Sequence, residues 1–200
     1  MHPNPAFRPA NDELCDQLVD AIGFGMVFAQ TADGPRVAHT PLVRAPGGTV
    51  RFHLANANAL TPHLEGTRAL LLVNGPHGYV SPRWYEEGGQ VPTWNYVAIE
   101  LEGRASKLSA EGLADLLGAI GALNEGRLAG DSPWRPQNVA PDLWEKLFSE
   151  ITGFEMAVEE RRATFKLSQN KPPEERERVA DALDAEGWPH IAAFMRSFAS

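Results

Sequence analysis

The stretch GFGMVFAQTADGPRVAHTPLVRAPGGTVRFHL, residues 23–54, decides the fold. Apolar and polar side chains alternate with a period of two over Gly25–Gln30, Arg36–Val43 and Val50–Leu54, a pattern typical of half-buried β-strands. The turn-forming sequences Ala-Asp-Gly-Pro and Ala-Pro-Gly-Gly separate these segments. The stretch therefore predicts consecutive antiparallel hairpins.

The sheet is expected to continue in later parts of the chain. We predict further strands at Ala69–Asn74, Tyr79–Ser81, Tyr96–Leu108 and Ile151–Val158, with Gly75–Pro92 containing a loop. The last strand alternates cleanly, with Phe154, Met156 and Val158 on one side and Glu155, Ala157 and Glu159 on the other.

Segments with the sequence features of helices lie before, between and after the predicted strands. Asn11 is a suitable N-cap for a first helix, which Gly23 closes. The other predicted helical segments are Leu60–Leu64, Ser109–Asn124, Asp142–Ser149 behind Pro141, Pro172–Ala185 and Pro189–Phe198, and residues 126–141 are predicted to be a loop.

Hairpins followed by helices predict a mainly antiparallel α+β fold, a barrel with peripheral helices. The alternation shows which faces are buried but not whether the sheet closes. The length of 200 residues suits a single domain, residues 1–200, with a C-terminal helical segment at 172–200.

Composition excludes several classes of protein. The chain is 43% hydrophobic, and no run of apolar residues is long enough for a membrane span or a secretory signal. Cys15 is the only cysteine, which excludes an internal disulfide and fits a cytoplasmic location. The net charge is −8, and Glu159–Arg178 interleaves basic with acidic residues, so direct DNA binding is not expected.

Four histidines invite a metal interpretation that their spacing does not support. His39, His53, His63 and His77 form no close helical repeat, and no carboxylate recurs beside them. We therefore predict no metal site. For each histidine taken alone, the alternative is a hydrogen-bonded residue at a strand end, and we favour this alternative for His63.

An aromatic-rich stretch leaves two interpretations open. Gly75–Tyr85 and Val91–Tyr96 combine aromatics with Pro and Gly, as expected of an ordered loop. One interpretation is a rigid lid or dimer contact. The other is a slot for a planar ligand, with stacking faces from Trp84, Trp94 and Tyr96 and hydrogen bonds from Thr93 and Asn95.

The segment Phe165–Lys171 places polar donors just before a proline-initiated helix. Its side chains Lys166, Ser168, Gln169 and Asn170 suit a phosphate. An ordinary solvated strand end that caps the next helix explains the same residues.

Taken together, these segments resemble the PaiB family of FMN-binding negative transcriptional regulators, within the wider group of pyridoxamine-phosphate-oxidase-like flavoproteins. The matching motifs occur in family order. They are Ala-His-Thr-Pro-Leu at 38–42, His-x-Ala-x-x-Asn at 53–58, Gly-Pro-His-Gly-Tyr-Val-Ser-Pro-x-Trp-Tyr at 75–85, Val-Pro-Thr-Trp-Asn-Tyr at 91–96 and Lys-Leu-Ser-Gln-Asn at 166–170.

The resemblance implies a split β-barrel, a homodimer, and FMN in a cleft between subunits. It implies that the backbone of His39, Thr40, Pro41 and Leu42 meets the edge of the isoalloxazine, with His53, Ala55 and Asn58 beside the ring and the ribityl-phosphate chain. Arg51 and Lys166 are the candidate cations for the phosphate. The remaining cleft residues, expected from the partner chain, are Thr93, Trp94, Asn95, Tyr96, Lys166, Ser168, Gln169 and Asn170.

Three functions follow from these observations. The resemblance favours a flavin-binding regulator, and the wider fold group suggests an FMN-dependent oxidoreductase of a small substrate. The third is a binding module for another planar ligand such as haem, contacted by a histidine.

Overall fold

The computed structural model describes residues 2–9, 11–128 and 133–197. The helices are α1 (Asp12–Ile22), α2 (Ala110–Glu125), α3 (Pro141–Ser149), α4 (Pro173–Ala185) and α5 (Pro189–Ser197). The strands are β1 (Phe24–Thr31), β2 (Gly34–Ala45), β3 (Thr49–Ala55), β4 (Arg68–Val80), β5 (Thr93–Lys107) and β6 (Ile151–Lys166). Residues 129–132 of the predicted loop and 198–200 of the C-terminal segment lie outside the described residues.

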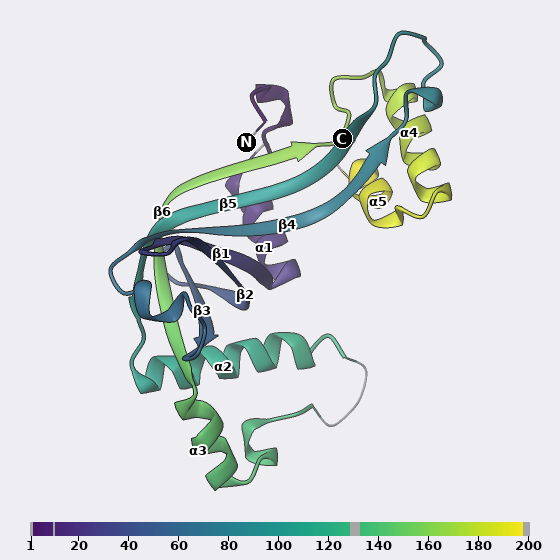
Figure 1. The fold of residues 1–200 in the computed structure, drawn as a ribbon. Coiled ribbons are helices and arrows are strands. Elements are labelled where there is room, and N and C mark those ends of the chain that lie inside the picture. The colour runs from purple at the N-terminus through teal and green to yellow at the C-terminus, as the bar shows by residue number, and fades with distance from the viewer. Residues whose placement is uncertain (1, 10, 129–132, 198–200) are drawn as a thin grey trace. The chain divides into compact units, whose positions relative to one another are not determined.

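The strands close into a barrel in the order β1-β2-β3-β6-β5-β4 (Figure 1). Strand β1 pairs with β2 from Phe24↔Pro41 to Thr31↔Gly34, and both this pair and β2–β3 are antiparallel. The prediction of consecutive antiparallel hairpins is therefore confirmed, and the question that the alternation left open is answered, because the sheet closes.

The chain divides into two compact units. The first, which we call the barrel unit, comprises residues 16–73 and 100–161. The second, the helical unit, comprises residues 1–15, 74–99 and 162–200. Strands β4, β5 and β6 each contribute residues to both units.

Interdigitating apolar side chains fill the interior of the barrel unit. Phe52 of β3 lies directly opposite Phe154 of β6, both are fully buried, and their rings stack with centroids 5.6 Å apart. Helix α2 packs against β2 and β3 and buries Leu113 and Leu116. As predicted, Ser109 caps this helix, because its hydroxyl accepts a hydrogen bond from the Gly112 N–H at 3.1 Å.

One glycine of the barrel unit is required by a close approach between strands. A Cβ atom added at Gly103 of β5 would lie 1.8 Å from the carbonyl oxygen of Ala157 in β6. Because this neighbour is backbone rather than a flexible side chain, only glycine fits without displacing a strand.

In the helical unit, α4 and α5 pack on the ends of the long strands. A Cβ atom at Gly78 of β4 would meet Leu183 of α4 at 2.9 Å and Ile191 of α5 at 3.0 Å, so the helices lie directly against the strand. Val179, Leu183, Ile191 and Met195 are buried there. The predicted pair of C-terminal helices is confirmed.

Three strands extend by three residues or more beyond their predicted bounds, and of these β5 begins at Thr93 rather than Tyr96. Gly75 and Pro76 were expected to begin a loop, but β4 continues to Val80. Pairing of β4 with β1 covers only Leu70 to Leu72, so the missing N–H of Pro76 interrupts no bond on that side. Strand β6 runs to Lys166, beyond the predicted end at Val158.

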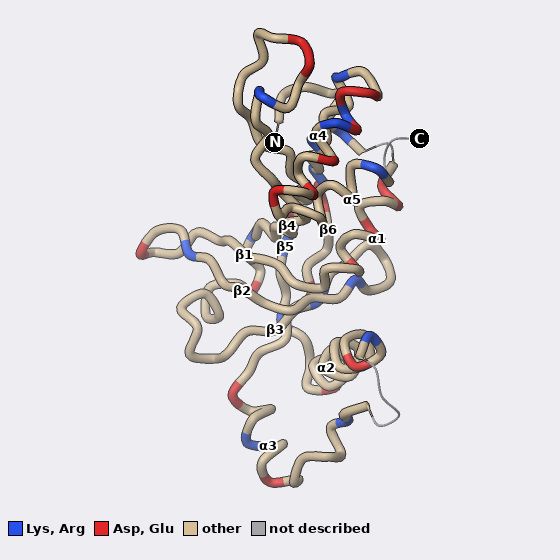
Figure 2. Tube along the Cα trace, turned by 90° about the vertical axis from the view of Figure 1, so that its right-hand side faces the viewer, with Lys and Arg blue, Asp and Glu red and all other residues tan. Residues whose placement is uncertain are grey.

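Charged residues of β4, β5 and β6 pair across the sheet. The guanidinium of Arg68 contacts Glu159 at 2.7 Å and Glu102 at 2.6 Å. Figure 2 shows that basic and acidic residues are interspersed along the described chain, as the sequence predicted.

Candidate functional site

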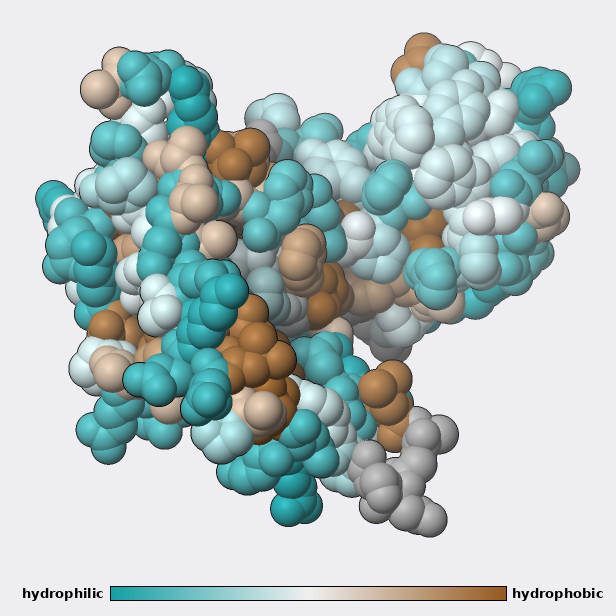
Figure 3. Space-filling view, turned by 60° about the horizontal axis from the view of Figure 1, so that its bottom comes forward, coloured by the Kyte–Doolittle hydropathy of each residue, from teal (hydrophilic) through white to brown (hydrophobic). Residues whose placement is uncertain are grey.

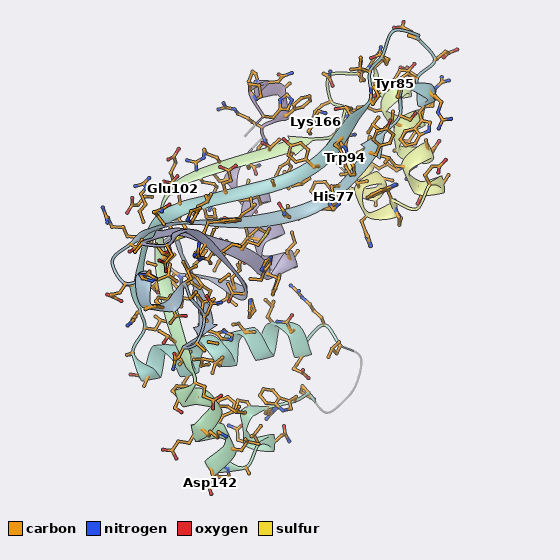
Figure 4. The ribbon with its side chains drawn as sticks, in the orientation of Figure 1. His77, Tyr85, Trp94, Glu102, Asp142 and Lys166 are labelled. Carbon is orange, nitrogen blue, oxygen red and sulfur yellow. The ribbon has the colours of Figure 1, made fainter. Side chains whose placement is uncertain are left out.

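An exposed group of aromatic rings lies on one face of the sheet in the helical unit. We call His77, Tyr79, Trp94 and Trp188 the aromatic cluster. The Trp94 ring lies 5.9 Å from His77 and 5.7 Å from Trp188, measured between centroids. The Trp94 and Tyr79 ring centroids are 6.1 Å apart. The Trp94 side chain is 47% exposed. Figure 4 shows His77 and Trp94 on the neighbouring strands β4 and β5.

The alternation of β5 separates residues that the sequence analysis assigned to one slot. Trp94 is exposed on the cluster face, whereas Asn95 is buried on the opposite face. The Asn95 amide donates to the Ser168 hydroxyl at 2.9 Å and contacts the Met195 sulfur at 3.3 Å. A single slot therefore does not receive Trp94 and Asn95 together, and the Asn95 amide is already bonded within the protein.

Beneath that opposite face lies a small cavity of about 180 Å³, which we call the lysine pocket. Lys166 and Lys171 both line it, and its walls contain no acidic residue. The full lining consists of Tyr85, Gln90, Val91, Thr93, Asn95, Lys166, Ser168, Asn170 and Lys171. Lys166 and Tyr85 are labelled in Figure 4.

Lys166 is held between two acceptors. Its ammonium donates to the Trp94 carbonyl at 2.7 Å and to the hydroxyl of Thr93, and it lies 5.9 Å from the centre of the Phe7 ring. Burial lowers the pKa of Lys166, since desolvation disfavours the charged form. The ammonium is therefore partly removed from water.

The neighbouring Gln169 does not reach out toward a ligand. Its side-chain oxygen accepts from the Leu167 N–H at 2.7 Å, and its side-chain nitrogen donates to the Phe165 carbonyl. For this residue the structure favours the alternative of a bonded strand end.

In the barrel unit, strand β2 separates from β3 beside predicted ligand residues. The β2–β3 ladder runs from Leu42↔Phe52 to Ala45↔Thr49 and does not include His39, Thr40 or Pro41. The Thr40 hydroxyl instead donates to the His53 carbonyl at 2.6 Å. His39, Thr40 and Pro41 thus pair with β1 but not with β3, and Thr40 places this part of β2 next to His53.

His53 has an unusual environment for a histidine. Its Nδ1 atom is buried and has no hydrogen-bond partner among the described residues. Burial also lowers the pKa of His53, so the imidazole is held in its neutral form. By contrast, His39 is exposed and stacks on Phe24 at 6.5 Å.

In the barrel unit, the predicted ligand residues Arg51 and Asn58 make contacts within the protein. Arg51 donates to Glu155 at 2.6 Å, so its charge is balanced across β3 and β6. The Asn58 side chain accepts from the Leu60 N–H at 2.9 Å and stabilises the turn after β3. Ala55 is exposed at the end of β3.

A large apolar groove lies between α2 and α3, and the sequence analysis did not identify it. Its volume is about 650 Å³, and apolar residues gather on this face in Figure 3. The Trp144 ring lies 6.4 Å from both Trp134 and Phe148. The signal available in the sequence was the short helix α3, where Leu143 and Leu147 are exposed apolar residues.

The described residues contain no group of three or more His, Cys, Asp or Glu side chains able to hold a metal ion. Within the same ranges, no helix is both long enough and apolar enough to cross a membrane.

Comparison with solved structures defines the class of fold. The flavocytochrome Anf3 from Azotobacter vinelandii matches with a TM-score of 0.62 at 19% identity, covering 82% of this chain and 72% of that protein. The FAD and heme binding protein from Mycobacterium smegmatis matches with a TM-score of 0.60 at 15% identity, covering 91% and 81%. The split-barrel fold predicted from the sequence is confirmed.

Sequence comparison identifies the family. Residues 1–160 match the family model described as "Putative FMN-binding domain", and the chain belongs to this family. It is 31% identical over 188 residues to the "Protease synthase and sporulation protein PAI 2" of Bacillus subtilis, covering 92% of this chain and 89% of that protein. An uncharacterised Aspergillus fumigatus protein is 27% identical over 182 residues, covering 70% and 67%. The resemblance to the PaiB family is thereby confirmed.

Proposed function

We propose that the protein binds FMN with the edge of the isoalloxazine against the backbone of His39–Leu42, where β2 separates from β3. The observation that carries this proposal is the combination of this stretch of β2, which pairs with β1 but not with β3, with the orphaned Nδ1 of His53. A buried polar atom without a partner is costly. The flavin ring carries both donors and acceptors, so it suits an edge of this kind.

The residues suit the ring of FMN better than they suit its phosphate. Thr40, His53 and Ala55 lie around the open edge of the barrel unit, and the exposed Trp94 offers a stacking face. Arg51 is paired with Glu155, which leaves Lys166 as the better of the two candidate cations for the phosphate.

We propose further that the working form is a homodimer. In this arrangement one subunit supplies the backbone of His39–Leu42 with His53 and Ala55, and its partner supplies the exposed ring of Trp94 and the ammonium of Lys166. When bound, FMN supplies the redox chemistry, while the protein positions the ring and limits access of water to it.

The biological role that we propose is regulation in the cytoplasm, as the family resemblance suggests. Interspersed charges and a net charge of −8 disfavour direct contact with DNA, so regulation is proposed to act through a ligand or protein partner. Gel-shift assays at low salt, with and without FMN, should show no retention of DNA. Salt-sensitive retention would contradict this part of the proposal.

An FMN titration of the His53→Leu variant tests the ligand assignment. Removal of the half-buried imidazole, with its buried Nδ1, should weaken FMN binding about tenfold, the usual scale for a hydrogen bond to a buried group. His63→Leu is the control, because His63 is an exposed histidine in the turn after β3. Equal FMN affinity of the two folded variants would contradict the placement of the ring.

A further inference from the structure

The lysine pocket concentrates positive charge in an acidic protein. The chain contains only four lysines, and Lys166 and Lys171 both line this cavity. No acidic residue is part of the lining. Two cations converging without a carboxylate between them create a local site for an anion.

Each ammonium group has donors to spare. Lys171 donates to the Gln90 side chain at 2.6 Å and lies 5.2 Å from the centre of the Tyr85 ring. Lys166 donates to Thr93 and to the Trp94 carbonyl. An ammonium carries three N–H donors, so one donor of Lys166 and two of Lys171 remain for a ligand.

Two acidic side chains near Tyr85, those of Glu86 and Glu175, contact groups outside the pocket lining. Glu175 accepts from the Glu86 backbone N–H at 3.1 Å, and Glu86 pairs with Arg178 at 2.7 Å. The pKa of Tyr85 is raised chiefly by burial, and its hydroxyl is hydrogen-bonded to Ser168. Neither Glu86 nor Glu175 is part of the pocket lining.

The backbone beside the lysines is held in an unfavourable conformation. Ser168 has φ = 61°, the one positive value among the non-glycine residues that the structure describes. The Asn95 amide holds its hydroxyl at 2.9 Å, and the Lys171 N–H donates to its carbonyl at 2.9 Å. Strained backbone conformations that surrounding hydrogen bonds hold in place are common at ligand-binding sites.

We propose that the lysine pocket binds the phosphate group of a small-molecule phosphate ester, with Lys166 and Lys171 as the cations and Asn170 at its edge. Such a group presents several acceptor oxygens to the convergent donors, and the volume of about 180 Å³ accommodates it. The ester is either FMN itself or a second ligand.

The proposal for the lysine pocket does not depend on flavin binding, because inorganic phosphate serves as its probe.

Titration with inorganic phosphate at constant ionic strength tests the pocket directly. Backbone amide signals of Ser168–Lys171 in nuclear magnetic resonance spectra should shift in a saturable way, with a dissociation constant of about 1 mM or below. Lys171→Gln should weaken binding about tenfold or more, whereas Lys171→Arg should retain most of it. Lys146→Gln on α3 makes the same charge change far from the pocket in sequence and should have no effect.

Two outcomes would overturn the proposal. One is the absence of saturable shifts in the unmodified protein, and the other is equal phosphate affinity in the folded Lys171→Gln and Lys146→Gln variants. Parallel titrations with FMN and riboflavin identify the ester. If Lys171→Gln weakens FMN binding but not riboflavin binding, the pocket holds the flavin phosphate. If both flavins bind as before while phosphate binding is lost, the pocket serves a second ligand.

Discussion

Replacement of Trp94 by alanine separates a ligand-binding role from a structural one. Trp94 is 47% exposed, so much of its indole surface is free to contact a ligand. An exposed face of about 60–120 Å², at about 25 cal/mol per Å², corresponds to about 1.5–3 kcal/mol of binding free energy. The Trp94→Ala variant should therefore bind FMN about 10- to 100-fold more weakly.

The assay is quenching of FMN fluorescence on titration with each purified protein. Trp134→Ala is a matched control, because Trp134 is 44% exposed and makes a similar ring contact, with Trp144 at 6.4 Å. Its FMN affinity should stay within about twofold of the unmodified protein. Unchanged FMN affinity in the folded Trp94→Ala variant would refute the assignment of Trp94 to the flavin.

Two further predictions concern stability. Gly103→Ala should lower the free energy of unfolding by about 3 kcal/mol or more, because its Cβ would meet the Ala157 carbonyl at 1.8 Å. The control Gly118→Ala, in open space on α2, should be neutral or stabilising. Equal urea unfolding midpoints for the two variants would contradict this prediction. Because burial lowers the pKa of His53, the stability that it contributes is present above the unfolded value near 6.5 and is lost as pH falls below it. Between pH 7 and pH 5, the melting temperature of His53→Gln should fall less than that of the control His63→Gln. If the melting temperatures of the two variants fall in parallel with pH, the argument about His53 is wrong.

Most of the fold was predictable because its signals are local. Period-two alternation over residues 24–54 predicted three strands within one or two residues of their observed ends. The Asn11 cap was also predictable, and its side chain does accept from the Leu14 N–H at 3.0 Å. The observed extension of β4 through Pro76 was not, since it depends on where pairing with β1 ends.

The candidate site was only partly predictable, for a different reason. The motif at 91–96 drew attention to Trp94 and Asn95, but strand alternation sends the two side chains to opposite faces. The lysine pocket joins Tyr85 to Lys171, and only tertiary packing brings these distant residues together. The apolar groove likewise depends on how α3 packs near α2, where Trp144 meets Trp134.

Titration of FMN into the purified protein, with its molar mass measured by light scattering, tests the central claim most directly. The account predicts saturable fluorescence quenching at one FMN per subunit, in a species of twice the 21.8 kDa chain mass. Absence of quenching at high micromolar protein concentration would contradict the claim that this chain is a flavin-binding protein.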